Sequence, residues 1–196
     1  MKTCSEYRRQ SKEMLSGKWG IAIGVSVIFA IILTVSGTTL VGPLIIGGAL
    51  TVGYMRFFMR GFRDNELEFG DLFSAFDNNF SSTLFMYLLM NLFILLWSLL
   101  LVIPGIIASY AYSMAPMILA DNPEMGGYEA LQASKELMRG KKGKLFLLHL
   151  SYIGWILLSI PTLGILMLWV APWMEAATVA FYEDIKGEVN VEQNIA

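Results

Sequence analysis

Six long apolar stretches alternate along the chain with short uncharged turns and with longer charged segments. The first stretch, residues 19–35, would extend about 25 Å as a helix, close to the hydrocarbon thickness of about 30 Å. The pattern predicts an all-α fold, a polytopic membrane helix bundle with six transmembrane helices. We expect these helices at residues 19–35, 40–58, 84–103, 104–120, 145–160 and 163–182.

The connections between the stretches alternate in character. Those after the first, third and fifth stretches carry no charge, and Pro43, Pro104 and Pro161 mark them. Proline suits the first turn of a returning helix, because its missing N–H would have no partner there. We therefore expect three hairpins, each closed by a Pro turn.

Basic residues give the expected orientation. All 14 Lys and Arg residues fall in or beside the N-terminal segment, the long connections and the C-terminal segment. With six spans they share one side, which the positive-inside rule assigns to the cytoplasm; with four or five spans we expect them to scatter over both sides. The sequence thus predicts a multi-pass protein of the bacterial cytoplasmic membrane, with both termini cytoplasmic and the first stretch kept as an anchor rather than cleaved.

The charged segments contain amphipathic stretches and a short repeat. One apolar stripe at helical spacing predicts a cytoplasmic helix that lies on lipid headgroups or on the floor of the bundle: Phe69, Leu72, Phe73, Phe76 and Phe80. The segments SKEMLSGK (11–18) and SKELMRGK (134–141) are closely similar. With the proline spacing, they predict one membrane domain, 1–196, with internal repeats at 5–62, 68–123 and 127–184.

Catalytic signatures are missing. His149 is the only histidine, which excludes an HExxH zinc site, and the chain has no phosphate-binding P-loop motif. Cys4 is the only cysteine, which excludes an internal disulfide. We expect a protein that is not an enzyme and that has no metal, no cofactor and no nucleic-acid partner.

His149, Glu175 and Asn91 form a candidate intramembrane polar site. Ionisable residues inside a membrane usually face the bundle interior and find a partner. His149 and Glu175 fall at similar depths on neighbouring antiparallel stretches, so we expect their side chains within about 4 Å of each other. The alternative is that each snorkels toward headgroups, or bonds Ser151, Thr178 or water, without a function.

Pro116 and Pro172 are expected inside helices, where each would free a backbone carbonyl and kink the helix. These kinks serve either packing, or gating and ion coordination. Small residues in the first two stretches favour close helix packing within the chain or between two copies: Gly20, Gly24, Gly47, Gly48 and Gly53.

Several segments together resemble a bacterial family of small multi-pass membrane proteins of unknown function. They are LLWSLLLVIPGIIASYAYSMAPMILADNP (95–123), ALQASKELMRGKKGKLF (130–146), LSYIGWILLSIPTLGI (150–165) and AFYEDI (180–185). KEMLSGKW and GDLFSAF also fit, so the similarity runs from about Arg9 to Asp184. The resemblance implies a membrane location and no particular chemistry.

Two functions remain open on the sequence. The first is a non-enzymatic membrane protein that binds, scaffolds or regulates other membrane components, with lipids, other membrane proteins or a second copy as partners. The alternative is a transporter or channel for a small solute or lipid, which the repeat and the mid-helix prolines favour. A continuous polar path would favour transport, and a dry apolar interior would favour the scaffold.

Overall fold

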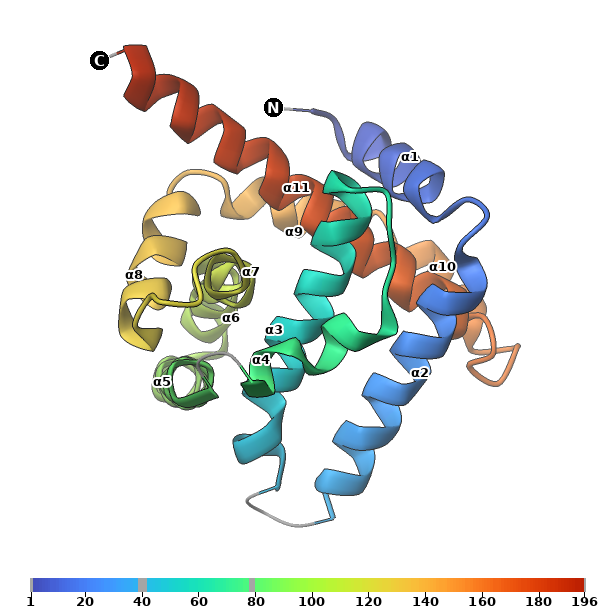
Figure 1. Cartoon of the computed structure of the whole chain (residues 1–196), viewed down its shortest axis with the longest axis horizontal. Helices are drawn as coiled ribbons and strands as arrows, with labels where there is room; N and C mark the ends of the chain where they lie inside the picture. The colour runs from blue at the N-terminus through green and yellow to red at the C-terminus, as the bar shows by residue number, and fades with distance from the viewer. Residues whose placement is uncertain (1, 39–41, 78–79, 196) are drawn as a thin grey trace. The chain divides into compact units, whose positions relative to one another are not determined.

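The structure, a computed structural model, describes residues 2–38, 42–77 and 80–195. Within these ranges the ordered elements are all helices (Figure 1). They are α1 (Cys4–Leu15), α2 (Trp19–Ser36), α3 (Gly42–Arg63), the 3₁₀ helix η1 (Phe69–Phe73), α4 (Ser74–Asp77), α5 (Phe80–Leu100), α6 (Val102–Tyr112), α7 (Ala115–Asp121), α8 (Gly127–Leu137), α9 (Lys142–Leu150), α10 (Ile153–Ser159) and α11 (Met167–Ile195).

Four helical segments among the described residues are long and apolar enough to cross a membrane: Trp19–Ser36, Gly42–Arg63, Phe80–Leu99 and Val102–Asp121. They coincide with the first four predicted stretches. The all-helical fold is confirmed, and the helices are compatible with a membrane protein. The last two predicted spans are not among the four.

The fifth stretch is not one helix. The backbone turns at Ser151 and Tyr152, so that α9 has 9 residues and α10 has 7. The turn after α10 is also longer than expected, because α11 begins only at Met167. Pro161 therefore lies in this turn, whereas Pro43 and Pro104 lie in the first turns of α3 and α6, as predicted.

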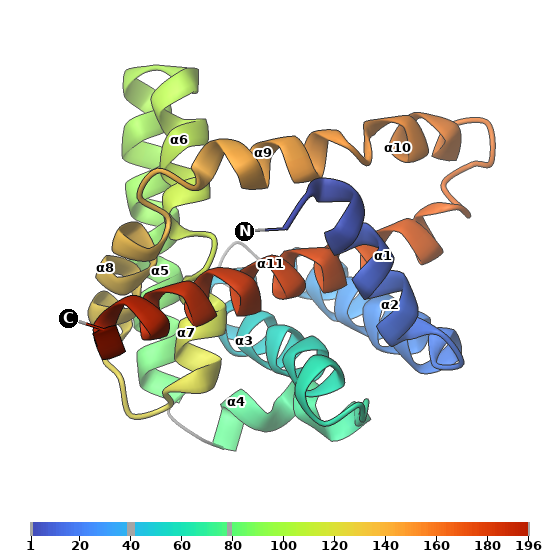
Figure 2. The same cartoon turned by 90° about the horizontal axis from the view of Figure 1, so that it is seen from above.

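The chain divides into two compact units, and the second comprises Phe29–Arg56 and Gly70–Lys142. Its centre is the antiparallel pair α5 and α6, which lie side by side in Figure 2. Helix α8 covers α5 closely: a Cβ at Gly127 would come within 2.5 Å of the Met86 backbone nitrogen. A Cβ at Gly48 of α3 would likewise come within 2.6 Å of the Thr83 carbonyl oxygen. Close helix packing within the chain thus explains why position 48 is a glycine.

In the predicted amphipathic stretch 69–80, residues 69–77 form η1 and α4, Phe80 begins α5, and residues 78 and 79 lie outside the described residues. Leu72 is fully buried, and Phe69 and Phe73 remain exposed. Helix α8 also has an apolar stripe, and it faces inward, since Ala130, Leu131 and Ser134 are buried. Helix α8 therefore packs on protein, while η1 keeps apolar rings on the surface.

The first unit comprises Met1–Ile28, Phe57–Phe69 and Gly143–Ala196. Helix α1 begins with a capping box between Thr3 and Glu6, which satisfies its first N–H groups. Its buried face lies along α11, as Figures 1 and 2 both show. That face is a single stripe at helical spacing, made of Tyr7, Ser11, Met14 and Leu15.

Gly20 and Gly24, by contrast, face open space, since a Cβ at either position would meet nothing within 4 Å. The chain itself does not use this small-residue pair for close packing.

Candidate functional site

His149 lies near the end of α9 and faces α11. Its Nε2 is 3.1 Å from Oγ1 of Thr178, and that hydroxyl lies 3.0 Å from the Met174 carbonyl, to which it donates. Because the hydroxyl has a single proton, Nε2 of His149 is the donor in the first of these bonds. The bond to Thr178 is one of the alternatives that the sequence left open.

Glu175 lies on α11 three residues before Thr178, on the same side of the helix, and its side chain is half-buried. His149 on α9 and Glu175 on α11 therefore lie on helices that meet at the His149–Thr178 bond. A direct pair between His149 and Glu175 stays a prediction.

Asn91 belongs to the second unit and is exposed on α5. Its amide nitrogen donates to the carbonyl of Tyr87, four residues earlier, at 2.8 Å. The Asn91 side chain thus finds a hydrogen-bond acceptor on its own helix.

The two prolines differ in setting. Pro172 lies inside α11, as predicted. The expectation of an uninterrupted helix through Pro116 is wrong: the helix breaks after Tyr112, and Pro116 stands in the first turn of α7. A proline is well accommodated there, because the first turn needs no N–H donor.

The contact between α1 and α11 is a polar network that sequence reasoning missed. The Tyr7 hydroxyl donates to Oδ2 of Asp184, and the Lys2 backbone N–H donates to the same oxygen at 3.1 Å. Burial alone would raise the pKa of Asp184, but these two hydrogen bonds, together with nearby positive charge that includes Lys2, hold the pKa below its usual 3.8. Burial, followed by the bond to Asp184, raises the pKa of Tyr7.

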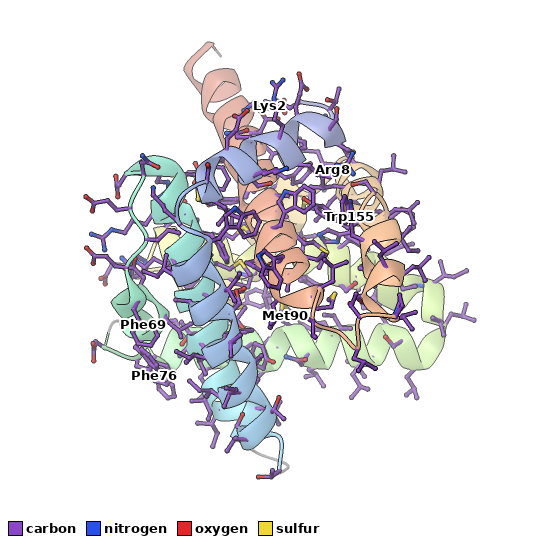
Figure 3. All side chains as sticks on the ribbon, turned by 90° about the vertical axis from the view of Figure 1, so that its right-hand side faces the viewer. Lys2, Arg8, Phe69, Phe76, Met90 and Trp155 are labelled. Atoms are coloured by element: carbon purple, nitrogen blue, oxygen red, sulfur yellow. The ribbon has the colours of Figure 1, made fainter. Side chains whose placement is uncertain are left out.

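Arg8 makes the second part of this contact. Its guanidinium Nη1 donates to the Ser151 carbonyl at 3.1 Å and lies over the ring of Tyr152, 6.0 Å from the centroid. The indole N–H of Trp173 donates to the Arg8 carbonyl at 2.9 Å. Arg8 therefore joins α1 both to the break between α9 and α10 and to α11. Figure 3 shows it on the side of the molecule that carries Trp155 of α10.

These partners lie 143 to 182 residues apart in the sequence. Arg8 and Tyr7 stand in a segment whose periodicity predicts only an amphipathic helix, so no local signal identifies their partners. Tyr152 is a further surprise: its hydroxyl is buried without a hydrogen-bond partner among the described residues.

The second unit has a cleft of about 310 Å³ beside the α5–α6 pair. Its walls are mostly apolar and aromatic, from Trp97, Pro104, Ile107, Ala108, Ala111 and Tyr112, and Lys135 and Lys142 also line it. An apolar cleft with two ammonium groups suits a molecule with a hydrocarbon part and a negative head. Sequence reasoning missed it, because Lys135 and Lys142 are distant from Trp97 along the chain.

In the part of the chain that the structure describes, no group of three His, Cys, Asp or Glu residues could hold a metal ion. A family model described as "Protein of unknown function (DUF975)" matches residues 1–107 and 99–189. No curated protein and no solved structure matches the chain.

Proposed function

Because the chain belongs to this family of proteins of unknown function, no activity can be carried over, and we propose a function from the geometry alone. The protein is a non-enzymatic integral membrane protein that binds and holds together other membrane components. Lipids are its first partners. Other membrane proteins, or a second copy of this chain, bind to the same kind of surface.

The observation that carries this proposal is the apolar character of the described interior. The buried polar residues are six hydroxyl side chains: Ser11, Ser26, Thr83, Ser134, Ser159 and Thr178. Each donates to a backbone carbonyl, in all cases but Ser134 on its own helix. These six hydroxyls offer a solute no free donor, and the buried Tyr152 hydroxyl is a single group rather than a continuous path, which favours binding or scaffolding over transport.

A second observation supports a lipid environment. Large apolar side chains are exposed around all three proline turns, where a soluble protein would not leave such contiguous patches. They include Val35 and Ile45 near Pro43, Leu99 and Ile103 near Pro104, and Ile160 and Leu163 near Pro161.

The proposed topology has both termini in the cytoplasm of a bacterial cell. The basic residues support it, but they do not support six spans over four. If only the four long helices cross, residues 122–196 stay on the N-terminal side, and the basic residues still share one side. The expectation that four spans would scatter them is therefore wrong. Six spans in three equivalent hairpins remain a prediction.

The experiment is purification in mild detergent from the native membrane, followed by mass spectrometry of the lipids and proteins that remain bound. We expect anionic phospholipid to be retained, and the double variant Lys135→Gln, Lys142→Gln to retain several-fold less. Arg9→Gln with Lys12→Gln is the matched control, because it removes two exposed cations of α1 far from the cleft in sequence.

Equal loss in the control, or no loss in the cleft variant, would count against the cleft as the lipid site. The alternative function, transport of a small solute or lipid, would gain support if reconstituted protein made vesicles permeable. We expect no such permeability.

A further inference from the structure

The third apolar hairpin, made of α9, α10 and the start of α11, differs from the first two. Its chain from Lys142 to Ser159 is broken into helices of 9 and 7 residues, as Val102–Asp121 is broken into α6 and α7, but only Val102–Asp121 is long and apolar enough to cross a membrane. Nothing in this hairpin is among the four segments able to cross a membrane. The hairpin nevertheless has a strongly apolar surface.

That surface lies at the tip. Leu163 is 92% exposed, Ile160 70% and Ile165 60%, and no charged residue lies between Lys144 and Glu175. Leu163 also adopts a positive φ of 51°, which is uncommon for a residue with a side chain. A tip of this composition requires apolar surroundings, and lipid acyl chains provide them.

Arg8 shows how deep the tip can reach. Helix α1 is highly charged, and the side chains of Arg9 and Glu13 are 74% and 69% exposed, so α1 belongs in the headgroup layer rather than in hydrocarbon. Arg8 of this helix contacts Ser151, and its carbonyl binds Trp173. Residues 151 and 173 therefore lie at about the level of the headgroups.

The length beyond that level is too short for a span. Helix α10 has 7 residues, and Met167 to Trp173 is also seven residues, so each arm rises about 10 Å. The hydrocarbon core is about 30 Å thick, and one leaflet supplies about half of it.

The residues that Arg8 contacts belong to a cluster of aromatic side chains at the same level. Tyr152 and Trp173 meet edge to face with ring centroids 5.1 Å apart, and Trp155 lies 5.8 Å from Trp173. Trp and Tyr are enriched where headgroups meet hydrocarbon, because their rings combine an apolar body with a polar group. The cluster and Arg8 thus agree on where the membrane surface lies.

We propose that α9–α11 is not a pair of spans but a re-entrant hairpin, whose tip is buried in the acyl chains of the cytoplasmic leaflet alone and whose base α1 holds at the headgroups. This inference rests on the proposed membrane location and orientation. It assigns one lipid-binding surface to residues 153–169 and leaves only the four long helices as spans.

The test uses cysteine accessibility in the full chain, with Cys4→Ser as the background. Thr162→Cys probes the tip, and Thr38→Cys probes the α2–α3 turn; both positions are exposed in the structure. Spheroplasts and inverted vesicles are treated with a membrane-impermeant maleimide. We expect Thr38→Cys to react from outside, and Thr162→Cys to react from neither side until detergent is added.

Reaction of Thr162→Cys from outside, at the rate of Thr38→Cys, would overturn the re-entrant hairpin and leave the membrane location intact. Reaction in inverted vesicles without detergent would overturn it too, because the tip would then lie in the cytoplasm. Extraction of the protein from membranes by alkaline carbonate would overturn this inference together with the proposed function.

Discussion

At the scale of single residues, the bond from Tyr7 to Asp184 links the first helix of the chain to the last. The two side chains belong to α1 and α11, and Tyr7 is fully buried. Asp184 keeps the Lys2 backbone N–H as a second donor. This pair gives the α1–α11 contact a pH dependence that can be derived from the geometry.

Tyr7→Phe should lower the free energy of unfolding by about 1–2 kcal/mol, because Asp184 loses a donor. The pKa of Asp184 is depressed in the folded protein, so its contribution is present above its ordinary pKa of 3.8 and is lost as the pH falls through the lower folded value. The variant should therefore lose less stability than the wild type on acidification below about pH 4. Thermal melting in detergent between pH 6 and pH 3 measures both effects.

Tyr152→Phe is the matched control, since it removes a buried hydroxyl that has no partner among the described residues. We expect no loss of stability, or a small gain. If Tyr152→Phe destabilised the protein as much as Tyr7→Phe, the two hydroxyls would not differ as the structure indicates.

At the scale of helices, close packing depends on individual glycines. Gly127→Ala would place a methyl group 2.5 Å from the Met86 backbone, which cannot yield as a flexible side chain would. We expect a loss of about 1–3 kcal/mol, seen as a lower melting temperature in detergent.

Gly24→Ala has the opposite setting, because the added methyl group meets nothing within 4 Å. Alanine also favours a helix over glycine, so no loss is expected. A destabilised Gly24→Ala variant would instead indicate that a second copy packs on this face.

Helix positions were predictable to different degrees. The stretch 19–35 predicts α2 (Trp19–Ser36) almost residue for residue, because a long run of apolar side chains favours one continuous helix. The break at Ser151 was not predictable, because Arg8, which binds its carbonyl, is 143 residues away. Helix α11 was expected to end at 182 and continues to Ile195, because hydropathy reports where the apolar run ends and not where the helix ends.

The candidate site was predictable only in part. The sequence predicts that His149 lies on a stretch antiparallel to the one that carries Glu175, and His149 does contact α11 through Thr178. The partner Thr178 could not be singled out, because several side chains on α11 lie at similar depth. The α1–α11 network and the cleft depend on tertiary contacts that no local pattern encodes.

At the scale of the whole molecule, the orientation is testable by fusions. Alkaline phosphatase fused after Thr38 should be active, and phosphatase fused after Gly187 should be inactive, because the positive residues keep both termini inside. A cytoplasmic reporter active after Thr38 would refute this orientation. The fusions cannot tell four spans from six, because both place the same ends on the same sides; the accessibility of Thr162→Cys makes that distinction.

The bond from Trp173 to Arg8 also has a consequence for the order of synthesis. The two residues are 165 positions apart. At about 5–20 residues per second, the ribosome needs roughly 8–33 s to add the partner that α1 requires. During that interval the apolar stripe of α1 must be covered by the membrane surface or by a chaperone. The first helix to be made is therefore among the last to reach its final place, and a nascent chain arrested before residue 173 should leave α1 open to protease.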